Sequence, residues 1–214
     1  MATVAVIDYG MGNLHSISKA LKTVSPDANV IVSADKNTIL SADHVIFPGV
    51  GAIRDCMAAI RAAGLDETIK HVAKSKPLLG ICIGMQALLE HSEENGGVDG
   101  LGIIPGNVIK FSPNATNKQN NKLKIPHMGW NEVNFDSISP LFKNIAKKER
   151  FYFVHSYHAN KVGDNYVLAT TEYPNSFPSA IKWKNIVAVQ FHPEKSQHAG
   201  LQFLKNFLNW DGQS

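Results

Sequence analysis

One of the two cysteines in the sequence, Cys82, has the surroundings of a nucleophile. It stands in Gly80-Ile81-Cys82-Ile83-Gly84, after a short apolar run and before a segment of helical periodicity. A nucleophile at such a sharp strand-to-helix turn sits in strained backbone, and a glycine two positions away on either side avoids a collision there. The helix start would favour a thiolate and offer backbone N–H groups to an oxyanion. The alternative is a small buried hydrophobic residue, as most free cysteines are.

The other cysteine, Cys56, gives a useful contrast. It lies in the middle of a predicted helix with no flanking glycine. We therefore expect it in the core or on the surface, without a catalytic role.

A thiolate nucleophile needs a base and a group that orients the base. His192 and Glu194 are candidates because they follow directly after a predicted strand. In extended backbone, side chains two residues apart point to the same side, so the carboxylate could bind one imidazole nitrogen while the other faces the sulfur. Pro193 would stiffen the pair. The alternative is a surface turn with incidental charges.

A third motif, Phe47-Pro-Gly-Val-Gly51, also follows a predicted strand. Active sites of parallel sheets lie at the carboxyl ends of their strands. A turn of this composition exposes backbone N–H groups and leaves room for a substrate carbonyl. An ordinary connection between a strand and a helix is the alternative.

The elements that must position these motifs predict an α/β fold with an open, mostly parallel or mixed sheet and helices on both faces. In the first half, the predicted strands are 3–8, 29–33, 44–49 and 77–81, and the predicted helices are 13–24, 51–64 and the segment after Cys82. The second half indicates hairpins. Its predicted strands are 103–111, 151–157, 166–171, 179–183 and 186–191, before a helix at 197–209. The polar stretch 112–124 is predicted to be a flexible surface loop.

Composition excludes several classes of protein. The chain has 214 residues, enough for one domain with a sizeable core, and is 44% hydrophobic and 18% charged. A net charge of +3 without a long basic run gives no reason to expect nucleic acid. We find no signal peptide, no membrane span and no disulfide framework. These features predict a cytoplasmic enzyme-sized domain with free thiols.

The sequence offers no pattern for a cofactor. Cys82, His192 and Glu194 lack the second cysteine or clustered histidines of a zinc site. The segment 8–13, Asp-Tyr-Gly-Met-Gly-Asn, follows the first strand but has two of the three glycines of a dinucleotide loop. We therefore expect no metal and no nucleotide site.

Motifs along essentially the whole chain resemble the class I, or triad, glutamine amidotransferases. They are DYGMGN (8–13), GICIGMQ (80–86), PHMGWN (126–131), FVHSYH (153–158) and FHPEKS (191–196). PHMGWN together with HSYH is more specific than the triad and is similar to the branch of the family that serves histidine biosynthesis. The resemblance implies a flavodoxin-like fold, one glutaminase domain over 1–214, and hydrolysis of glutamine to glutamate and ammonia.

The resemblance also implies roles for the triad. Cys82 would attack the glutamine amide and form a glutamyl thioester, with His192 as general acid and base and Glu194 orienting it. The oxyanion hole would use the backbone N–H of Ile83 and one from the segment Gly49, Val50 and Gly51. That segment would reorient to complete the hole, and we expect its rearrangement to carry the signal from a partner.

Glutamine itself must be held at both charged ends. Gln86, Glu90 and Glu94 are spaced four apart along the predicted helix and would share one face. The resemblance favours Gln86 and Glu94 for the ammonium group, with Gly51 and the backbone of His155–Ser156–Tyr157 also bracketing the substrate. The alternatives are a solvated acidic helix end and a core histidine at 155.

Glutamine hydrolysis does not account for the segment 126–131, which we expect to be a turn. Trp and Met are favoured at partner surfaces. The resemblance implies a heterodimer with a (β/α)₈-barrel cyclase, which receives the ammonia and makes imidazole glycerol phosphate and an aminoimidazole carboxamide ribonucleotide; hydrolase and lyase activities would then belong to one complex. The implied interface residues are Asn13, His127, Met128, Trp130, Tyr152 and Lys195. Core packing of Trp130 is the alternative.

Three other functions remain open from the residues. The chain could be a glutaminase for another acceptor, such as a chorismate or purine pathway, although PHMGWN argues against this. It could be a cysteine hydrolase that needs no partner and has no preference for glutamine. It could also be a non-enzymatic redox sensor or chaperone-like protein, in which case the His-Pro-Glu string would be a coincidence.

Overall fold

A mixed sheet runs through the centre of the computed structural model, which describes residues 2–114, 116, 122–136 and 139–213. Its eight described strands follow the order β2-β1-β3-β4-β14-β13-β12-β9. Neighbours from β2 to β14 are parallel and those from β14 to β9 are antiparallel. In that order the strands are Asn29–Ser33, Thr3–Ile7, His44–Gly49, Leu78–Cys82, Ile186–Val189, Ser176–Trp183, Val167–Glu172 and Asn134–Phe135.

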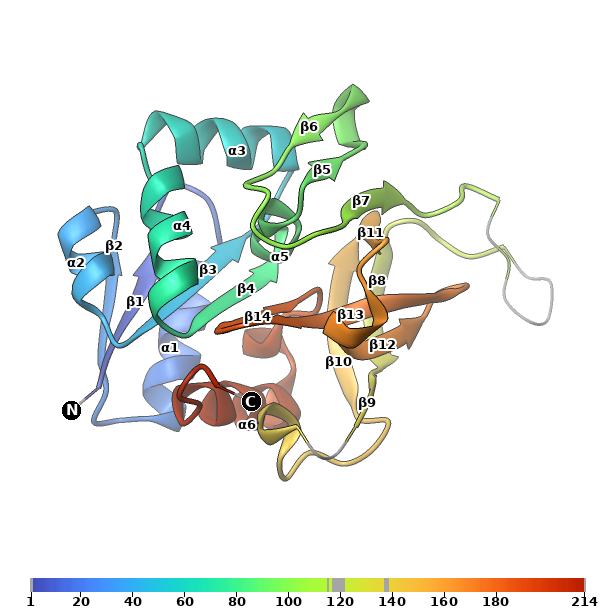
Figure 1. Ribbon diagram of the computed structural model, residues 1–214. Coiled ribbons are helices and arrows are strands. Elements are labelled where there is room, and N and C mark those ends of the chain that lie inside the picture. The colour runs from blue at the N-terminus through green and yellow to red at the C-terminus, as the bar shows by residue number, and fades with distance from the viewer. Residues whose placement is uncertain (1, 115, 117–121, 137–138, 214) are drawn as a thin grey trace.

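Helices cover the parallel half of this sheet on both sides (Figure 1). α1 packs against α6, and α2 packs against α4. Strands β1, β3, β4 and β14 are buried almost throughout, which explains why their sequences are continuous apolar runs. The helices are α1 (Leu14–Val24), α2 (Lys36–Ser41), α3 (Ile53–Ala62), α4 (Asp66–Ser75), α5 (Ile83–Leu88) and α6 (Gln197–Leu208).

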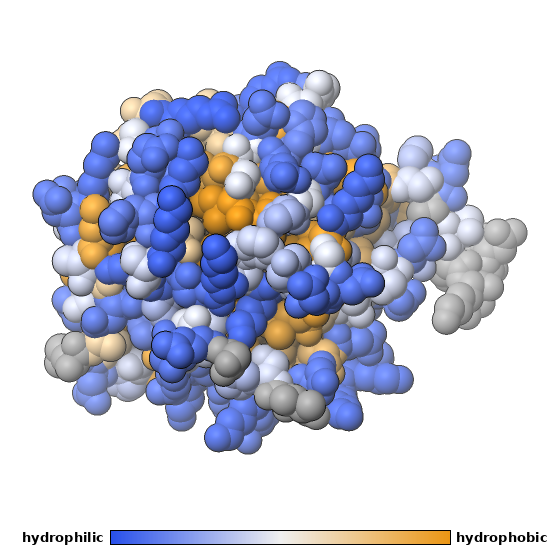
Figure 2. Space-filling model, viewed as in Figure 1, coloured by the Kyte–Doolittle hydropathy of each residue, from blue (hydrophilic) through white to orange (hydrophobic). Residues whose placement is uncertain are grey.

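Two smaller sheets lie beside the carboxyl ends of the parallel strands. One pairs β8 with β10, and the other has the order β11-β7-β5-β6 within the described residues. Hydrophilic side chains cover most of the face seen in Figure 2. The strands are β5 (His91–Ser92), β6 (Val98–Asp99), β7 (Asn107–Lys110), β8 (His127–Glu132), β10 (Arg150–His155) and β11 (Tyr157–Asn160).

The expected α/β architecture is confirmed, and the strand predictions at 29–33 and 44–49 match the observed bounds. Two other predictions were wrong in detail. The strand expected at 103–111 is limited to Asn107–Lys110, because the backbone N–H groups of Ile103 and Ile104 bond to the Leu88 carbonyl at the end of α5 and not to a neighbouring strand. The strand expected at 151–157 divides at Ser156 into β10 and β11, which belong to different sheets.

The segment 126–131, which we expected to be a turn, is largely strand β8. Its residues pair with β10 in antiparallel register from His127 to Glu132. The prediction of a turn was wrong because the segment pairs with a distant strand. Even Gly129, whose φ is 128°, stays in the ladder opposite Phe153. Helices α2 and α4 were not predicted. The predicted loop at 112–124 lies partly outside the described residues.

Within the part of the chain that the structure describes, we find no helix of the length and hydrophobicity that a membrane crossing requires.

Candidate active site

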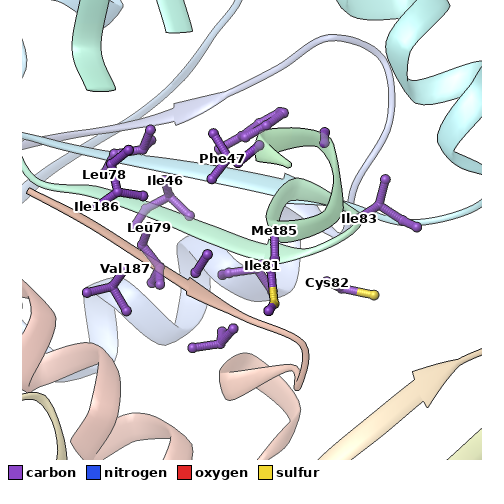
Figure 3. Close-up of a cluster of buried hydrophobic side chains, with 14 of the residues drawn as sticks. Ile46, Phe47, Leu78, Leu79, Ile81, Cys82, Ile83, Met85, Ile186 and Val187 are labelled. Carbon is purple, nitrogen blue, oxygen red and sulfur yellow. The ribbon is translucent and has the colours of Figure 1, made fainter. Parts of the chain in front are cut away.

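Cys82 occupies the junction between β4 and α5 with a backbone φ of 53° and ψ of −108°. This conformation is unusual for a residue with a side chain and is typical of strained functional sites. Figure 3 shows Cys82 at the end of β4, beside the buried cluster that includes Ile46 and Leu79. The strained turn predicted from the glycine-flanked cysteine is therefore present.

The flanking glycines permit this junction because each faces another element at very short range. A Cβ on Gly84 would lie 1.9 Å from the carbonyl oxygen of Phe47, and one on Gly80 would lie 2.8 Å from Leu88 Cδ1. The distance at Gly84 excludes any side chain because the atom it meets is backbone, whereas a side chain at position 80 would require the Leu88 methyl to move. The first turn of α5 can thus press against β3 only with glycine at position 84.

The sulfur of Cys82 is buried but has a polar neighbour. Gln190 Nε2 donates a hydrogen bond to Cys82 Sγ at 3.7 Å, and Gly49 lies beside Cys82 in the parallel register. Cys56 is a fully buried residue of α3 whose Sγ donates to the Tyr9 hydroxyl at 3.3 Å. Burial raises the pKa of Cys56 to about 12, so that this thiol stays protonated. Of the two readings for Cys56, the core is observed.

His192 and Glu194 interact directly. His192 Nδ1 lies 2.9 Å from Glu194 Oε1, and both side chains are almost fully buried. The geometric reason differs from the one expected: Glu194 lies in a 3₁₀ turn, Pro193–Lys195, and not in extended backbone. Ser196 closes this turn, because its hydroxyl donates to the His192 carbonyl at 2.6 Å and accepts from Tyr152 N at 2.9 Å.

The environment of His192 favours its protonated form. Burial alone lowers the pKa of His192, but the negative charge and hydrogen bonding of Cys82, followed by those of Glu194, outweigh it and raise the pKa to about 10. Among the described atoms, Nε2 has no partner that meets strict hydrogen-bond geometry. The side chain is thus held through Nδ1, and Nε2 is left to exchange a proton with the sulfur or a bound molecule.

A cavity of about 620 Å³ opens beside Cys82 and His192. This volume is within the range of small-molecule sites. Most residues expected to bind glutamine or an oxyanion line it, namely Val50, Gly51, Ile83, Gln86, Glu94, His155, Ser156 and Tyr157. Gly12, Asn13, Pro126, Val154 and Lys195 complete the lining.

Gln86, Glu90 and Glu94, which were expected on one face of a single helix, do not all belong to α5. α5 ends at Leu88, because the carbonyls of Ala87, Leu88 and Leu89 accept hydrogen bonds from backbone N–H groups of 101–104. Glu90 therefore lies outside the helix and accepts from Gly106 N at 3.1 Å. The prediction that Gln86, Glu90 and Glu94 share one helix face was therefore wrong. Glu90 is also absent from the residues that line the cavity.

Glu94 returns to the cavity from a separate 3₁₀ turn, Glu94–Gly96. Its Oε2 accepts from the backbone N–H of Ile53 at 3.1 Å, at the first turn of α3. A carboxylate is stabilised there by the unpaired N–H groups and the helix dipole. Glu94 thus adds a fixed negative charge to the wall that also contains Gln86.

The Gly49–Gly51 segment lies opposite the start of α5. A Cβ on Gly49 would be 2.8 Å from both Gly84 N and the Tyr9 hydroxyl, so no other residue fits there. Tyr9 donates from its hydroxyl to the Pro48 carbonyl at 2.7 Å, which ties the segment to the chain that follows β1. Gly51 has a φ of 94° and lines the cavity.

Of the residues expected at a partner interface, Met128 and Trp130 are 63% and 44% exposed. Trp130 contacts the Tyr152 ring at a centroid distance of 6.2 Å, and the Lys195 ammonium lies 5.7 Å from the same ring. The expectation for His127 was wrong: strand alternation turns it inward, where it is 4% exposed and stacks on Tyr173.

Three residues at the site were missed in the sequence: Tyr9, Gln190 and Ser196. Tyr9 and Ser196 lie inside motifs named above, Gln190 directly precedes one, and each acts through a hydrogen bond across 39 or more positions of sequence. The motifs identify residues that can react. The amide and hydroxyl groups that hold those residues in place have no local sequence pattern by which they could be predicted. The described residues contain no group of three His, Cys, Asp or Glu side chains arranged for a metal ion.

A model of the family "Glutamine amidotransferase class-I" matches residues 5–210. The chain is 53% identical over 212 residues to "Imidazole glycerol phosphate synthase subunit HisH" of Methylococcus capsulatus, covering 99% of this chain and 98% of that protein. It is also 53% identical over 213 residues to the Pseudomonas putida protein of the same name, with complete coverage of both.

Solved structures with 18% identity share the fold. "Structure of PurLQS from Thermotoga maritima" superposes with a TM-score of 0.71 and covers 98% of this chain and 99% of that chain. "Crystal structure of glutamine amidotransferase" also gives 0.71, with 95% and 98% covered.

We expect Gly84→Ala to lower the free energy of unfolding by at least about 3 kcal/mol, because the new Cβ would overlap the Phe47 carbonyl. The matched control is Gly102→Ala, where φ is 62° and no described atom lies within 4 Å of the new Cβ. That change carries only the left-handed strain of about 1–2 kcal/mol. Urea unfolding measures both, and equal losses would contradict the packing explanation.

We expect NMR titration of the His192 imidazole to give a pKa near 10 in the unmodified chain. Cys82→Ala should lower this pKa most, Glu194→Gln less, and Cys56→Ala not at all. Because folding raises this pKa above 6.5, the stability gained from the bound proton is complete below pH 6.5 and is lost as the pH rises towards 10. An unchanged pKa in Cys82→Ala would show that the sulfur is not the charge partner.

Proposed function

Because the chain belongs to the class-I glutamine amidotransferase family, we propose that Cys82, His192 and Glu194 are its catalytic triad. The chain is an enzyme subunit that hydrolyses glutamine to glutamate and ammonia, as the glutaminase of an imidazole glycerol phosphate synthase in histidine biosynthesis. Relatives about 50% identical over the full length favour this acceptor over the chorismate and purine alternatives. We further propose that residues 1–214 form one glutaminase domain.

One observation carries the assignment of the triad. The buried His192–Glu194 contact of 2.9 Å lies beside the strained, glycine-flanked Cys82, and both Cys82 and His192 face one cavity. A cysteine with only a packing role would not need a positive φ. A histidine–glutamate pair with only a packing role would not need to share a cavity with that sulfur. The arrangement suits a nucleophile, a base and an orienting carboxylate.

In the proposed first half-reaction, the Cys82 thiolate forms a bond to the amide carbon of glutamine, and the carbonyl electron pair moves to oxygen. Backbone N–H groups of Ile83 and of the Gly49–Val50–Gly51 segment would stabilise that oxyanion. His192 gives its proton to the nitrogen. The carbonyl then re-forms, the carbon–nitrogen bond breaks, and the nitrogen leaves as ammonia.

In the second half-reaction, His192 accepts a proton from water, and the oxygen attacks the thioester carbon. The carbon–sulfur bond breaks, glutamate forms, and Cys82 returns as a thiolate. Glu194 holds Nδ1 throughout and stabilises the imidazolium. The raised pKa of His192 supports this role, since the imidazole then carries the proton that the leaving nitrogen needs.

The cavity walls complement free glutamine. Glu94 and Gln86 would meet its α-ammonium group, since they supply a carboxylate and an amide oxygen to one wall. Gln86 Oε1 has no hydrogen-bond partner among the described atoms. Gly51 and the backbone of His155, Ser156 and Tyr157 would bracket the rest of the substrate.

We propose that the partner subunit is a (β/α)₈-barrel cyclase and that the two form a heterodimer. The exposed Met128 and Trp130, with Tyr152 and Lys195 beside them and Asn13 at the cavity wall, would form the interface. Ammonia would pass into the barrel and not into solvent, and the lyase step would belong to the partner. We expect this in the cytoplasm, where two free cysteines remain reduced.

The central test is glutamine hydrolysis by the chain alone, with the cyclase, and with the cyclase plus its nucleotide ligand. We expect strong stimulation by the liganded cyclase and a loss of at least about a thousandfold in Cys82→Ala. Cys56→Ala is the control, because its thiol is buried in α3 away from the cavity. Equal turnover with and without cyclase would instead indicate a free-standing hydrolase, and no turnover in any mixture would reject the glutaminase assignment.

A second test concerns the interface. We expect Trp130→Ala to weaken cyclase binding by about 30-fold, the scale of a buried aromatic anchor. Val32→Ala is the matched control, because Val32 is similarly exposed (42%) but lies on β2, at the opposite edge of the main sheet. Titration calorimetry measures both affinities. An effect at Val32 as large as at Trp130 would place the interface elsewhere.

A further inference from the structure

Strand β8 has two functional faces. Met128 and Trp130 point outward and are exposed, whereas His127 is buried on the other face and Asn131 is partly buried. This alternation is the ordinary consequence of the two-residue period of a strand. The inward face is not explained by packing alone, because two of its residues carry polar side chains.

These inward side chains begin a hydrogen-bond chain. Asn131 Nδ2 lies 3.1 Å from His127 Nε2, and His127 Nδ1 lies 3.0 Å from His155 Nε2. His155 Nδ1 in turn lies 2.7 Å from the Tyr157 carbonyl oxygen. The chain therefore leads from β8, across β10, to the backbone segment that lines the cavity beside Cys82.

The final acceptor fixes the direction of every bond. A carbonyl can only accept, so His155 Nδ1 carries hydrogen and its Nε2 accepts. His127 Nδ1 must then donate to His155, which leaves His127 Nε2 to accept from Asn131. The Asn131 amide is oriented independently, since its Oδ1 accepts from Glu132 N and its Nδ2 also donates to the Glu172 carbonyl.

Both histidines are thus neutral and held in one tautomer. Burial lowers the pKa of His127 to about 4 and that of His155 to about 3. Aromatic rings enclose the pair: His127 lies between Phe153 and Tyr173, and Phe111 contacts His155. Phenylalanine could fill such a site, but it could not donate to the Tyr157 carbonyl.

That carbonyl is shared with the proposed glutamine site. Gln86 Nε2 donates to it at 3.1 Å and also to Gln190 Oε1 at 3.0 Å. Gln190 Nε2 points to the sulfur of Cys82. With Nε2 occupied in this way, Gln86 Oε1 is the atom left for a ligand.

We propose that Asn131, His127 and His155 are positioning residues for glutamine, whose one-way hydrogen-bond chain fixes the Tyr157 carbonyl and, through it, the Gln86 amide. This inference rests on the proposed function, because it takes the cavity to be the glutamine site. It assigns the buried histidines a role in substrate binding that core packing would not require.

The first measurement is the tautomer of each histidine, by imidazole ¹⁵N NMR of the unmodified chain at neutral pH. We expect hydrogen on Nδ1 and a lone pair on Nε2 for both His127 and His155. Hydrogen on Nε2 of either ring would overturn the chain. This result does not depend on catalysis, so it stands apart from the test of the glutaminase assignment.

The second measurement is glutamine turnover with saturating, liganded cyclase. His155→Phe should raise KM for glutamine about tenfold, the scale of one lost hydrogen bond in a buried site, with kcat little changed. His158→Phe is the control: His158 packs on the same Phe111 ring, but its Nδ1 donates to the Ala159 carbonyl at 2.9 Å and takes no part in the chain from Asn131 to Tyr157. Asn131→Ala should shift KM in the same direction, and it carries the test if His155→Phe does not fold.

An unchanged KM in both His155→Phe and Asn131→Ala would overturn the positioning role, as would equal KM changes in His155→Phe and His158→Phe. Absence of turnover by the unmodified chain would instead reject the glutaminase assignment.

Discussion

The structure depends on the close approach of α5 to β3 at the end of β4. The Phe47 carbonyl lies where a Cβ of residue 84 would be, and Gly49 has no room for one either. This contact turns the chain through the strained conformation of Cys82 and points the helix start at the cavity. A looser junction would move the sulfur relative to His192, which follows a different strand, β14.

The rest of the site is assembled around this junction from segments distant in sequence. β14 lies next to β4 in the sheet, so the chain that follows it, with Gln190 and His192, arrives beside Cys82. The two smaller sheets supply the remaining walls through Glu94 and residues 155–157. The carboxyl edge of a parallel sheet gathers such residues because neighbouring strands end together there.

The parts of the fold and site predicted from sequence are those with a local signal. The buried parallel strands are visible in the sequence as apolar runs. The strained turn at Cys82 is predicted by the glycines on either side of it. The helix after Cys82 was overextended, because its end is set by hydrogen bonds from residues 101–104, which no local pattern reveals. His127 was misplaced for a related reason: the segment 126–131 was expected to be a turn, whereas pairing with the distant β10 makes it a strand whose alternation turns His127 inward.

The cost of burying the charges of His192 and Glu194 also explains why the groups that contact them and Cys82 are largely uncharged. A carboxylate and an imidazolium out of water, as in Glu194 and His192, are costly unless they are paired and hydrogen-bonded. A second positive charge on the nearby His155 would compete with His192 for the sulfur, and burial holds His155 neutral by lowering its pKa. Amides and carbonyls, in contrast, add direction without net charge, as Gln190 does at Cys82 and Tyr157 does at Gln86. The sulfur of Cys82 is therefore contacted by a neutral amide, that of Gln190, while the charge that faces it comes from His192, which Glu194 holds through Nδ1.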